Sequence, residues 1–300
     1  MVNHENQYVG DIGDYGKYSL LRVFSEAGIR VGVNWYLTEN DNSNDGKFTS
    51  YLQKEDMRCK DPVVFDALKM IAHKSGKSVK DIQCSGIIKN ALFYDKKLDG
   101  KGTPAERDRK RNKWLFKSME ELSDAELIFM DPDNGLLESN DASKLSAEKY
   151  VIPDEVELYF NAGHNVVYYC HKGRRTDDVW QKYKNTMFER IPSAKPAIIT
   201  FHKGSQRSYV FLIHEKDFVK YRKIIDSFMR GWSGIFSEEY TSKGDPASNV
   251  SGGKILLRKA DGTVVTLQQR ADGQIRIESS ANPGTEIIMP ADLICKLLGV

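Results

Sequence analysis

The residues best suited to chemistry form a short acidic segment in the middle of the chain. Asp131, Asp133 and Asn134 follow the apolar run Leu127–Met130, which has no polar break. Such a run predicts a strand that is buried on both faces of a sheet. Polar groups that leave a buried strand at its carboxyl end lie where open α/β sheets bind ligands. The alternative is an acidic strand-to-turn junction, because Asp, Pro, Asn and Gly are ordinary turn residues.

A second polar segment follows another predicted strand and carries the opposite charge. The strand Asn165–Cys170 ends in His171, Lys172, Arg174 and Arg175. In a parallel sheet this basic segment lies at the same edge as the acidic one. A lone histidine is more often structural than catalytic, but one inside a polar cluster at this edge is a candidate for proton transfer. The cations beside it suit a phosphate group.

The N-terminal region supplies a third polar group. Asp11, Asp14, Lys17 and Tyr18 precede an apolar stripe, which predicts a helix that starts near Asp14 and ends at Gly28. Carboxylates at a helix start complement the helix dipole, which is a sufficient structural reason for them. The functional alternative is that this polar, glycine-rich helix start lines a ligand pocket.

The next predicted strand, Ile29–Leu37, also ends in polar residues. Thr38–Gly46 is an acid- and amide-rich loop that contains Glu39. In a parallel sheet this loop again reaches the edge where ligands bind. The alternative is a long solvated turn, which Asp45-Gly46 favours.

A basic helix is predicted after Thr103. Thr103, Pro104 and Glu106 form a strong helix start, because Thr caps, Pro fits the first turn and Glu completes a capping box. The face of this helix is either a solvated charged surface or a surface that follows nucleic-acid phosphates. Its candidate phosphate contacts are Arg107, Arg109, Lys110, Arg111 and Lys113.

These elements predict an α/β protein with a mostly parallel, Rossmann-like sheet. Ala197–Phe201 and Tyr209–His214 predict a hairpin at the end of the sheet, within a domain of residues 1–240. Residues 241–253 read as a linker. Residues 254–300 then predict a small β-rich appendage that ends in a short helix, and we expect it to bind a protein partner or to self-associate.

Composition limits the class of protein. The 300 residues carry a formal net charge of +2, and 29% of them are charged, as is normal for a soluble globular protein. The four cysteines are widely scattered and form no C-x-x-C pair, so we predict neither a zinc knuckle nor a redox motif. Reduced thiols, a polar N-terminus and the lack of a long apolar run predict a cytoplasmic protein without a membrane segment.

The order of the elements resembles that of the Rossmann-type S-adenosylmethionine-dependent methyltransferases. More narrowly, the chain is similar to the bacterial 23S rRNA adenine-N6 methyltransferases, whose entry helix reads Asn-His-Ala-Asp-x-x-Lys-His. Asp14 and Lys17 match the acid and the lysine of this motif, while Asp11 replaces the Asn and Tyr18 the second His. The family's Asp-Pro-Pro-Tyr signature corresponds to residues 131–134.

The resemblance implies a methyl transfer to a base of a nucleic acid. It implies that Asp11, Asp14, Lys17, Tyr18 and Glu39 surround S-adenosylmethionine. Two departures from the family are clear: its glycine-rich loop is replaced by residues 38–46, and the Asp-Pro motif has no aromatic residue to stack on an extruded base. The residues that would act on the base are Asp131, Asp133, Asn134, His171 and Lys172.

A second hypothesis is hydrolysis of phosphodiesters with Mg²⁺. Asp131 and Asp133 would bind the ion through oxygen ligands, with Asp11, Asp14 or Glu39 completing the shell. In this mechanism His171 would activate water, and Lys172 or Arg174 would offset the charge that develops on phosphate. A third hypothesis is a non-catalytic binding protein that keeps the fold without the chemistry.

Overall fold

The computed structural model describes two units, residues 1–241 and residues 242–300. The described residues are 9–39, 48–139 and 141–239, Ala281, and the four strands of the second unit. The predicted linker 241–253, most of the loop 38–46 and the predicted C-terminal helix lie outside the described residues. In the described part of the chain, no helix is long and apolar enough to cross a bilayer.

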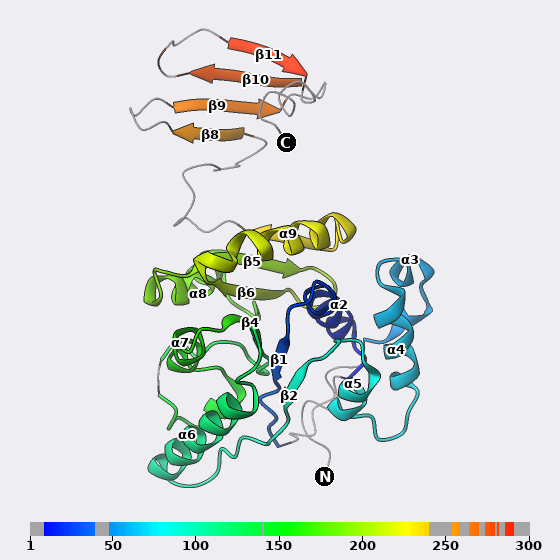
Figure 1. Cartoon of the computed structure of the whole chain (residues 1–300), viewed down its shortest axis with the longest axis vertical. Coiled ribbons are helices and arrows are strands. Elements are labelled where there is room, and N and C mark those ends of the chain that lie inside the picture. Colours follow the sequence, from blue (N-terminus) through cyan, green and yellow to red (C-terminus); the bar gives the residue numbers. More distant parts are fainter. Residues whose placement is uncertain are drawn as a thin grey trace. The chain divides into compact units, whose positions relative to one another are not determined.

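The first unit is built on a seven-stranded mixed sheet (Figure 1). Four parallel strands come first, and the remaining three alternate in direction. The α/β class is confirmed, and the two strands β5 and β6 pair as the predicted hairpin. In spatial order the strands are β2 (Leu92–Tyr94), β1 (Val31–Asn34), β3 (Leu127–Met130), β4 (Asn165–His171), β6 (Arg207–Ile213), β5 (Lys195–Phe201) and β7 (Phe236–Glu239).

Helices cover both faces of this sheet. One core contains side chains of α2 (Ile12–Glu26), α4 (Pro62–Ala72), α5 (Val79–Ser85) and α9 (Glu215–Gly231). The other contains side chains of α6 (Pro104–Glu121), α7 (Pro153–Asn161) and α8 (Asp177–Arg190). The remaining short helices are η1 (Ser50–Gln53), α3 (Glu55–Arg58) and η2 (Ala147–Lys149).

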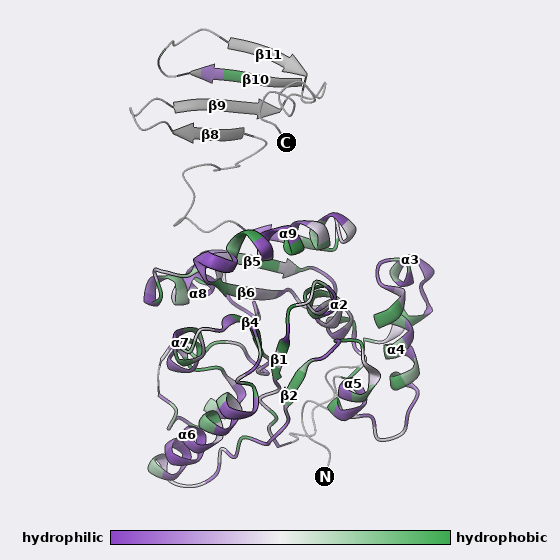
Figure 2. Ribbon diagram, viewed as in Figure 1, coloured by the Kyte–Doolittle hydropathy of each residue, from purple (hydrophilic) through white to green (hydrophobic). Residues whose placement is uncertain are grey.

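The central strand β3 contacts both cores. Leu127 and Phe129 point to one core and Ile128 and Met130 to the other, and all four side chains are fully buried. This alternation explains the unbroken apolar run, because a strand with a helical layer on each face has no solvent side. Figure 2 shows the same contrast, with apolar strands at the centre and a largely hydrophilic α6 at the margin.

Local backbone conformation limits the length of two strands. β1 ends at Asn34 rather than at the predicted Leu37, and Tyr36 has a φ of 47°. β2 begins at Leu92, two residues after Asn90, which has a φ of 54°. Left-handed residues leave the extended conformation that pairing needs, so each one terminates its strand.

The helix starts follow the capping rules. Asp11 caps α2 by accepting a hydrogen bond from the Asp14 amide at 2.9 Å, so this helix begins two residues before the predicted start. Thr103 and Glu106 form the predicted capping box of α6. The strand β7 was not predicted, because Phe-Ser-Glu-Glu lacks an apolar period; Thr200 anchors it by donating to Glu239 at 2.6 Å.

The second unit contains four antiparallel strands in the order β11-β10-β9-β8. The antiparallel β8–β9 and β9–β10 pairs are consistent with the β-rich character predicted for residues 254–300. A separate β-rich domain stays a prediction. The strands are β8 (Lys254–Arg258), β9 (Val264–Gln269), β10 (Gln274–Ser279) and β11 (Glu286–Pro290).

The prediction that Arg111 faces phosphates is wrong. Arg111 is 3% exposed and forms a two-bond ion pair with Glu155, with N–O distances of 2.6 and 2.8 Å. It also donates to the carbonyls of Ala147 and Tyr150, while Glu155 accepts from the Tyr36 hydroxyl at 2.9 Å. This pair fastens α6 to α7, so the residue is structural.

Replacing Arg111 tests that structural role. Arg111→Met should destabilise the protein by about 3–5 kcal/mol, because it leaves the buried Glu155 carboxylate without its cation. Arg109→Met on the same helix is the matched control; Arg109 is exposed, so its effect should stay within about 0.5 kcal/mol. Urea unfolding measures both, and an Arg111→Met loss below about 1 kcal/mol would contradict the assignment.

Candidate functional site at the carboxyl edge of the sheet

The start of α2 meets the carboxyl end of β3. Lys17 Nζ lies 2.7 Å from Asp131 Oδ2 and 2.9 Å from Asp14 Oδ1. The Lys17 side chain is only 12% exposed, and both carboxylates are buried. Two of the three predicted polar groups therefore share one place in the fold, although more than a hundred residues separate them in the chain.

The contacts continue from α2 to β6. Arg207 Nη2 lies 3.2 Å from Asp11 Oδ2, and Asp11 caps the helix through the Asp14 amide. These contacts join two cations, Arg207 and Lys17, to three carboxylates, Asp11, Asp14 and Asp131, and we call these five residues the edge network. When all five side chains are ionised, the positive and negative charges of the edge network balance to within one unit. This balance lowers the cost of burying so many ionised groups.

A glycine makes the Arg207 contact possible. A Cβ on Gly13 would overlap the Arg207 guanidinium, so only glycine allows that side chain to cross the first turn of α2. Ile12 and Gly13 follow the capping residue directly. The glycine-rich helix start therefore has a packing reason, and the packing brings a cation to the site.

Aromatic side chains surround Lys17. Its ammonium lies 5.0 Å from the Tyr18 ring centroid and 5.7 Å from the Trp35 ring centroid. The Trp35 indole nitrogen and the Tyr209 hydroxyl are buried, and neither has a hydrogen-bond partner among the described residues. The Thr38 hydroxyl, beyond the end of β1, is also buried and has no hydrogen-bond partner among the described residues. Buried polar atoms of this kind are usually satisfied, so these three are candidate hydrogen-bond partners for a polar ligand.

Burial dominates the electrostatics of Asp131. Removal from water raises its pKa to about 6, although Lys17 acts in the opposite direction. Burial also disfavours the charged form of Lys17, but Asp131 and Asp14 outweigh it and hold the lysine pKa well above its usual value. At neutral pH the pair is ionised, and Asp131 is a carboxylate close to its titration range.

The basic end of β4 lies at the same edge. His171 pairs with Arg207 across the antiparallel β4–β6 ladder, and the Lys172 amide donates to the Gln206 carbonyl at 3.2 Å. Burial, then Arg175 and Arg207, lower the pKa of His171, and the Asp133 carboxylate raises it only in part. The predicted meeting of the three polar groups at one edge of the sheet is therefore confirmed.

Most of the basic segment is held by neighbours. Lys172 forms an ion pair with Asp177 at the start of α8. The Arg175 guanidinium lies 4.1 Å from the Tyr183 ring centroid, which fixes its direction. Arg174 is exposed. Asn134 is half-buried, and its backbone amide donates to the Lys149 carbonyl at 2.9 Å.

The structure does not bring Glu39 or the α6 cations into the edge network. Glu39 is exposed and pairs with Lys101 at 2.7 Å. Arg107 binds the carbonyls of Gly102 and Ser143, and Lys110 pairs with Asp99, so both hold loops in place. Of the five phosphate contacts predicted on α6, only Arg109 and Lys113 are exposed.

The metal hypothesis meets a cation that is already present. Within residues 9–39, 48–139 and 141–239, no group of three or more His, Cys, Asp or Glu side chains is arranged to hold a metal ion. The Lys17 ammonium lies between Asp14 and Asp131, where it supplies the positive charge that Mg²⁺ would bring. Asp133 lies near enough to His171 for its carboxylate to act against the lowering of the imidazole pKa.

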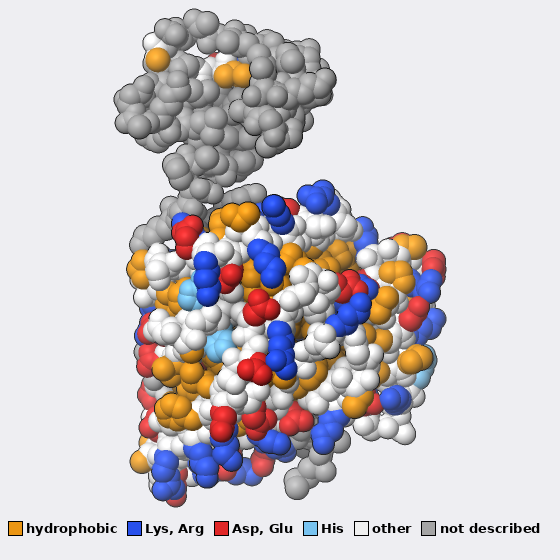
Figure 3. Space-filling model, viewed as in Figure 1, with side chains coloured by type: hydrophobic (Ala, Val, Ile, Leu, Met, Phe, Trp, Pro, Cys, Tyr) orange, Lys and Arg blue, Asp and Glu red, His pale blue; other side chains and the backbone are white. Residues whose placement is uncertain are grey.

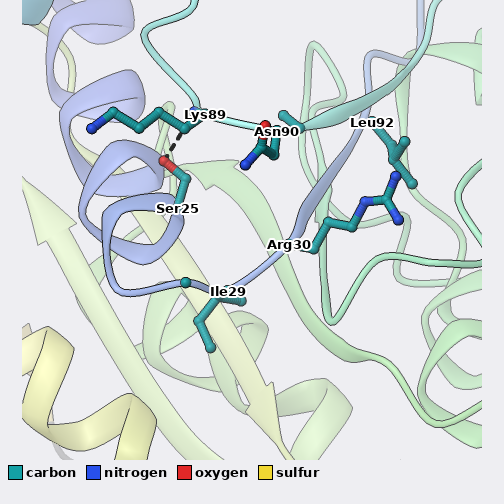
Figure 4. Close-up of a pocket in the computed structure, with 8 residues that line it drawn as sticks. Ser25, Ile29, Arg30, Lys89, Asn90 and Leu92 are labelled. Atoms are coloured by element: carbon teal, nitrogen blue, oxygen red, sulfur yellow. Dashed lines mark hydrogen bonds between the residues drawn. The ribbon is translucent and has the colours of Figure 1, made fainter.

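Two hollows lie elsewhere on the first unit. One of about 510 Å³ lies at the amino ends of β1 and β2 and is lined by Ser25, Arg30, Lys89, Asn90 and Leu92 among others (Figure 4). Its cations already have partners, since Arg30 pairs with Asp124 and Lys89 lies 3.5 Å from Glu26.

The other hollow, of about 490 Å³, lies between α2, α4 and α9. Ligands of open α/β sheets bind beyond the carboxyl ends of the strands, so we place the site at the edge network instead of in either hollow. On the face seen in Figure 3, acidic and basic side chains of the first unit are interspersed.

Comparisons with known proteins identify no family. No family model matches the chain, and no curated protein matches it. Six solved chains match, among them the protein LPL1258 from Legionella pneumophila, described under the family name DUF519. It has 11% sequence identity and a TM-score of 0.42, over 80% of this chain and 98% of that one. A likeness of this size carries no functional inference.

Arg207 of the edge network, and the nearby Tyr209 and Trp35, were not among the predicted site residues. Arg207 and Tyr209 reach the site because β6 pairs with β4, and Trp35 because β1 ends early. The signal that was available is the polar turn His202–Arg207 before β6, next to a predicted hairpin. Its position beside β4 depends on the strand order, which local pattern does not determine.

Asp131 should leave a signature in the pH dependence of stability. Its folded pKa of about 6 exceeds the ordinary 3.8, so the folded state binds this proton more tightly than the unfolded chain. The carboxyl stabilises the fold fully below about pH 4, and that contribution, about 3 kcal/mol, is lost as pH rises through about 6. Relative to the wild type, Asp131→Asn should therefore gain stability between these two pH values.

Asp99 is the control of opposite sign. The hydrogen bond from Lys110 lowers the pKa of this exposed carboxyl, so its contribution is lost as pH falls. Asp99→Asn should therefore lose stability relative to the wild type as pH rises from about 3 to 5. Unfolding midpoints across pH measure both variants, and a flat Asp131→Asn difference curve would contradict the buried, raised carboxyl.

Proposed function

We propose that the first unit is a Rossmann-like, S-adenosylmethionine-dependent methyltransferase that acts on an exocyclic amine of a nucleic-acid base. The observation that carries the proposal is the meeting of Asp131, at the carboxyl end of β3, with Lys17 from the polar start of α2. The sheet supports it, because its parallel strands and the β5–β6 hairpin are compatible with the Rossmann-like layout of the class that the chain resembles. Cytoplasmic location belongs to the same proposal.

The donor set of the site suits this cofactor. When bound, S-adenosylmethionine supplies an electrophilic methyl group, and its amino-acid part carries a carboxylate and an ammonium. Lys17 and Arg207 are the cations that would bind the carboxylate, and Asp11 and Asp14 the anions that would bind the ammonium. The Thr38 hydroxyl, which has no hydrogen-bond partner among the described residues, offers a further hydrogen bond.

Asp131 is the residue we assign to the acceptor amine. As a carboxylate it accepts a hydrogen bond from the amine, which fixes the direction of the nitrogen lone pair. As the nitrogen–carbon bond forms, the sulfur–methyl bond would break and leave a neutral thioether, so the positive charge would move to the amine. The buried carboxylate would stabilise that charge more than it stabilises the neutral amine. A carboxyl with a pKa of about 6 also accepts the released proton near neutral pH.

Cations around the edge suit the nucleic-acid backbone. Arg174 is exposed beside His171, and Arg175 is held in a fixed direction by Tyr183. Arg109 and Lys113 form a weaker second surface on α6, where acids accompany them. We assign the second unit, a small β-rich appendage, to binding of a protein partner or to self-association.

Metal-dependent phosphodiester hydrolysis is the second candidate. The proximity of His171 to Asp133 favours it, since a neutral imidazole beside a carboxylate can activate water. Lys17 weighs against it, because an ammonium already occupies the space between Asp14 and Asp131. Cleavage of nucleic acids with Mg²⁺, abolished by Asp131→Asn, would favour this candidate over methyl transfer.

Cofactor binding and transfer test the proposal in sequence. Calorimetry of the full chain with S-adenosylmethionine should show saturable heat, and Lys17→Met should weaken it by roughly tenfold or more. Transfer of labelled methyl to bulk RNA or DNA should fall by about 10²–10³-fold in Asp131→Asn, while the donor still binds. Absence of heat at millimolar donor, or full transfer by Asp131→Asn, would overturn the proposal.

The acid limb of the pH–rate profile, where the transfer rate falls at low pH, should shift when Lys17 is replaced. Only ionised Asp131 accepts the amine, so the transfer rate should fall as pH drops through about 6. Lys17 holds that pKa down, and Lys17→Met at saturating donor should therefore move the limb to higher pH. A limb that stays in place or moves to lower pH would show that a different group titrates.

A further inference from the structure

The acidic segment at the end of β3 lacks a ring for an extruded base, but the neighbouring strand supplies one. Tyr169 and His171 alternate along β4 and so lie on the same face, with ring centroids 6.2 Å apart at 37°. Both are half-buried. We propose that His171 is the platform on which the target base stacks while Asp131 holds its amine; this inference rests on the proposed function.

His171 fits this role better than Tyr169. Tyr169 packs against the core that contains α2 and α9, and its hydroxyl bonds with Arg207. His171 is the last residue of β4 and lies within electrostatic reach of Asp133, in the segment that follows Asp131. A base held by Asp131 thus has the half-buried His171 ring on the neighbouring strand to stack on.

The imidazole is uncharged at neutral pH. Burial and the cations Arg175 and Arg207 both disfavour its protonated form. A neutral ring stacks on a base without adding positive charge beside a sulfonium donor. The arrangement therefore replaces the aromatic residue that the Asp-Pro motif lacks with a ring of suitable charge from the next strand.

The chain turns directly after His171. Gly173 has a φ of 58°, and a Cβ on it would lie 3.6 Å from one edge of the His171 ring, at ordinary contact distance. Arg174 is exposed just beyond this glycine. The target nucleotide thus meets a ring and a cation within four residues, which is the usual combination for single-stranded nucleic acid.

Two substitutions of His171 separate stacking from packing. His171→Leu fills similar space without a ring, whereas His171→Phe keeps a ring without ionisation. His171→Leu should raise the apparent KM for the accepted RNA or DNA pool by on the order of 10–100-fold, and His171→Phe should restore most of it. His202 is an exposed histidine on the turn between β5 and β6, so His202→Ala is the matched control and should leave KM unchanged.

Donor affinity distinguishes failure of this inference from failure of the proposed function. S-adenosylmethionine should bind all four proteins equally by calorimetry, with circular dichroism confirming that each is folded. If the wild type binds donor and transfers methyl, but His171→Leu keeps the wild-type KM or His171→Phe fails to rescue, the stacking role is overturned. If the wild type binds no donor, the proposed function fails and the inference fails with it.

Discussion

The contact on which the rest of the site depends is the buried ion pair between Lys17 and Asp131. It joins the first helix of the unit to the end of its central strand, across 114 residues of chain. A buried carboxylate and a buried ammonium each lose much hydration energy, which their mutual contact offsets. Lys17 also pairs with Asp14, so the Lys17–Asp131 pair is continuous with the rest of the edge network.

The fold supplies this pair with rigid supports. β3 is buried on both faces, so Asp131 leaves a strand that cannot shift without disturbing two cores. Asp11 caps α2 and also binds Arg207 on β6, so one side chain fixes the helix start and a second cation. Preorganised charges of this kind are what a methyl-transfer site needs, because they do not have to rearrange as charge develops.

Much of this arrangement could be predicted from local pattern. The bounds of β3, the capping box at Thr103 and the polar start of α2 follow from periodicity and capping chemistry, which act within a few residues. Arg111 could have been placed correctly, since it precedes Leu115 by one helical turn and shares its buried face. The positions of Arg207 and Tyr209 could not be predicted, because they depend on β6 pairing with β4 as well as with β5.

A double-mutant cycle on Lys17 and Asp131 tests the central claim most directly. The free energies of unfolding of Lys17→Met, Asp131→Asn and the double variant give the coupling between the two side chains at neutral pH. If the pair stabilises the fold, the coupling should be about 2 kcal/mol or more. The loss of unfolding free energy in the double variant should then be smaller than the sum of the losses in the two single variants. Losses that add to within about 0.5 kcal/mol would show that the two groups do not interact and would contradict the account.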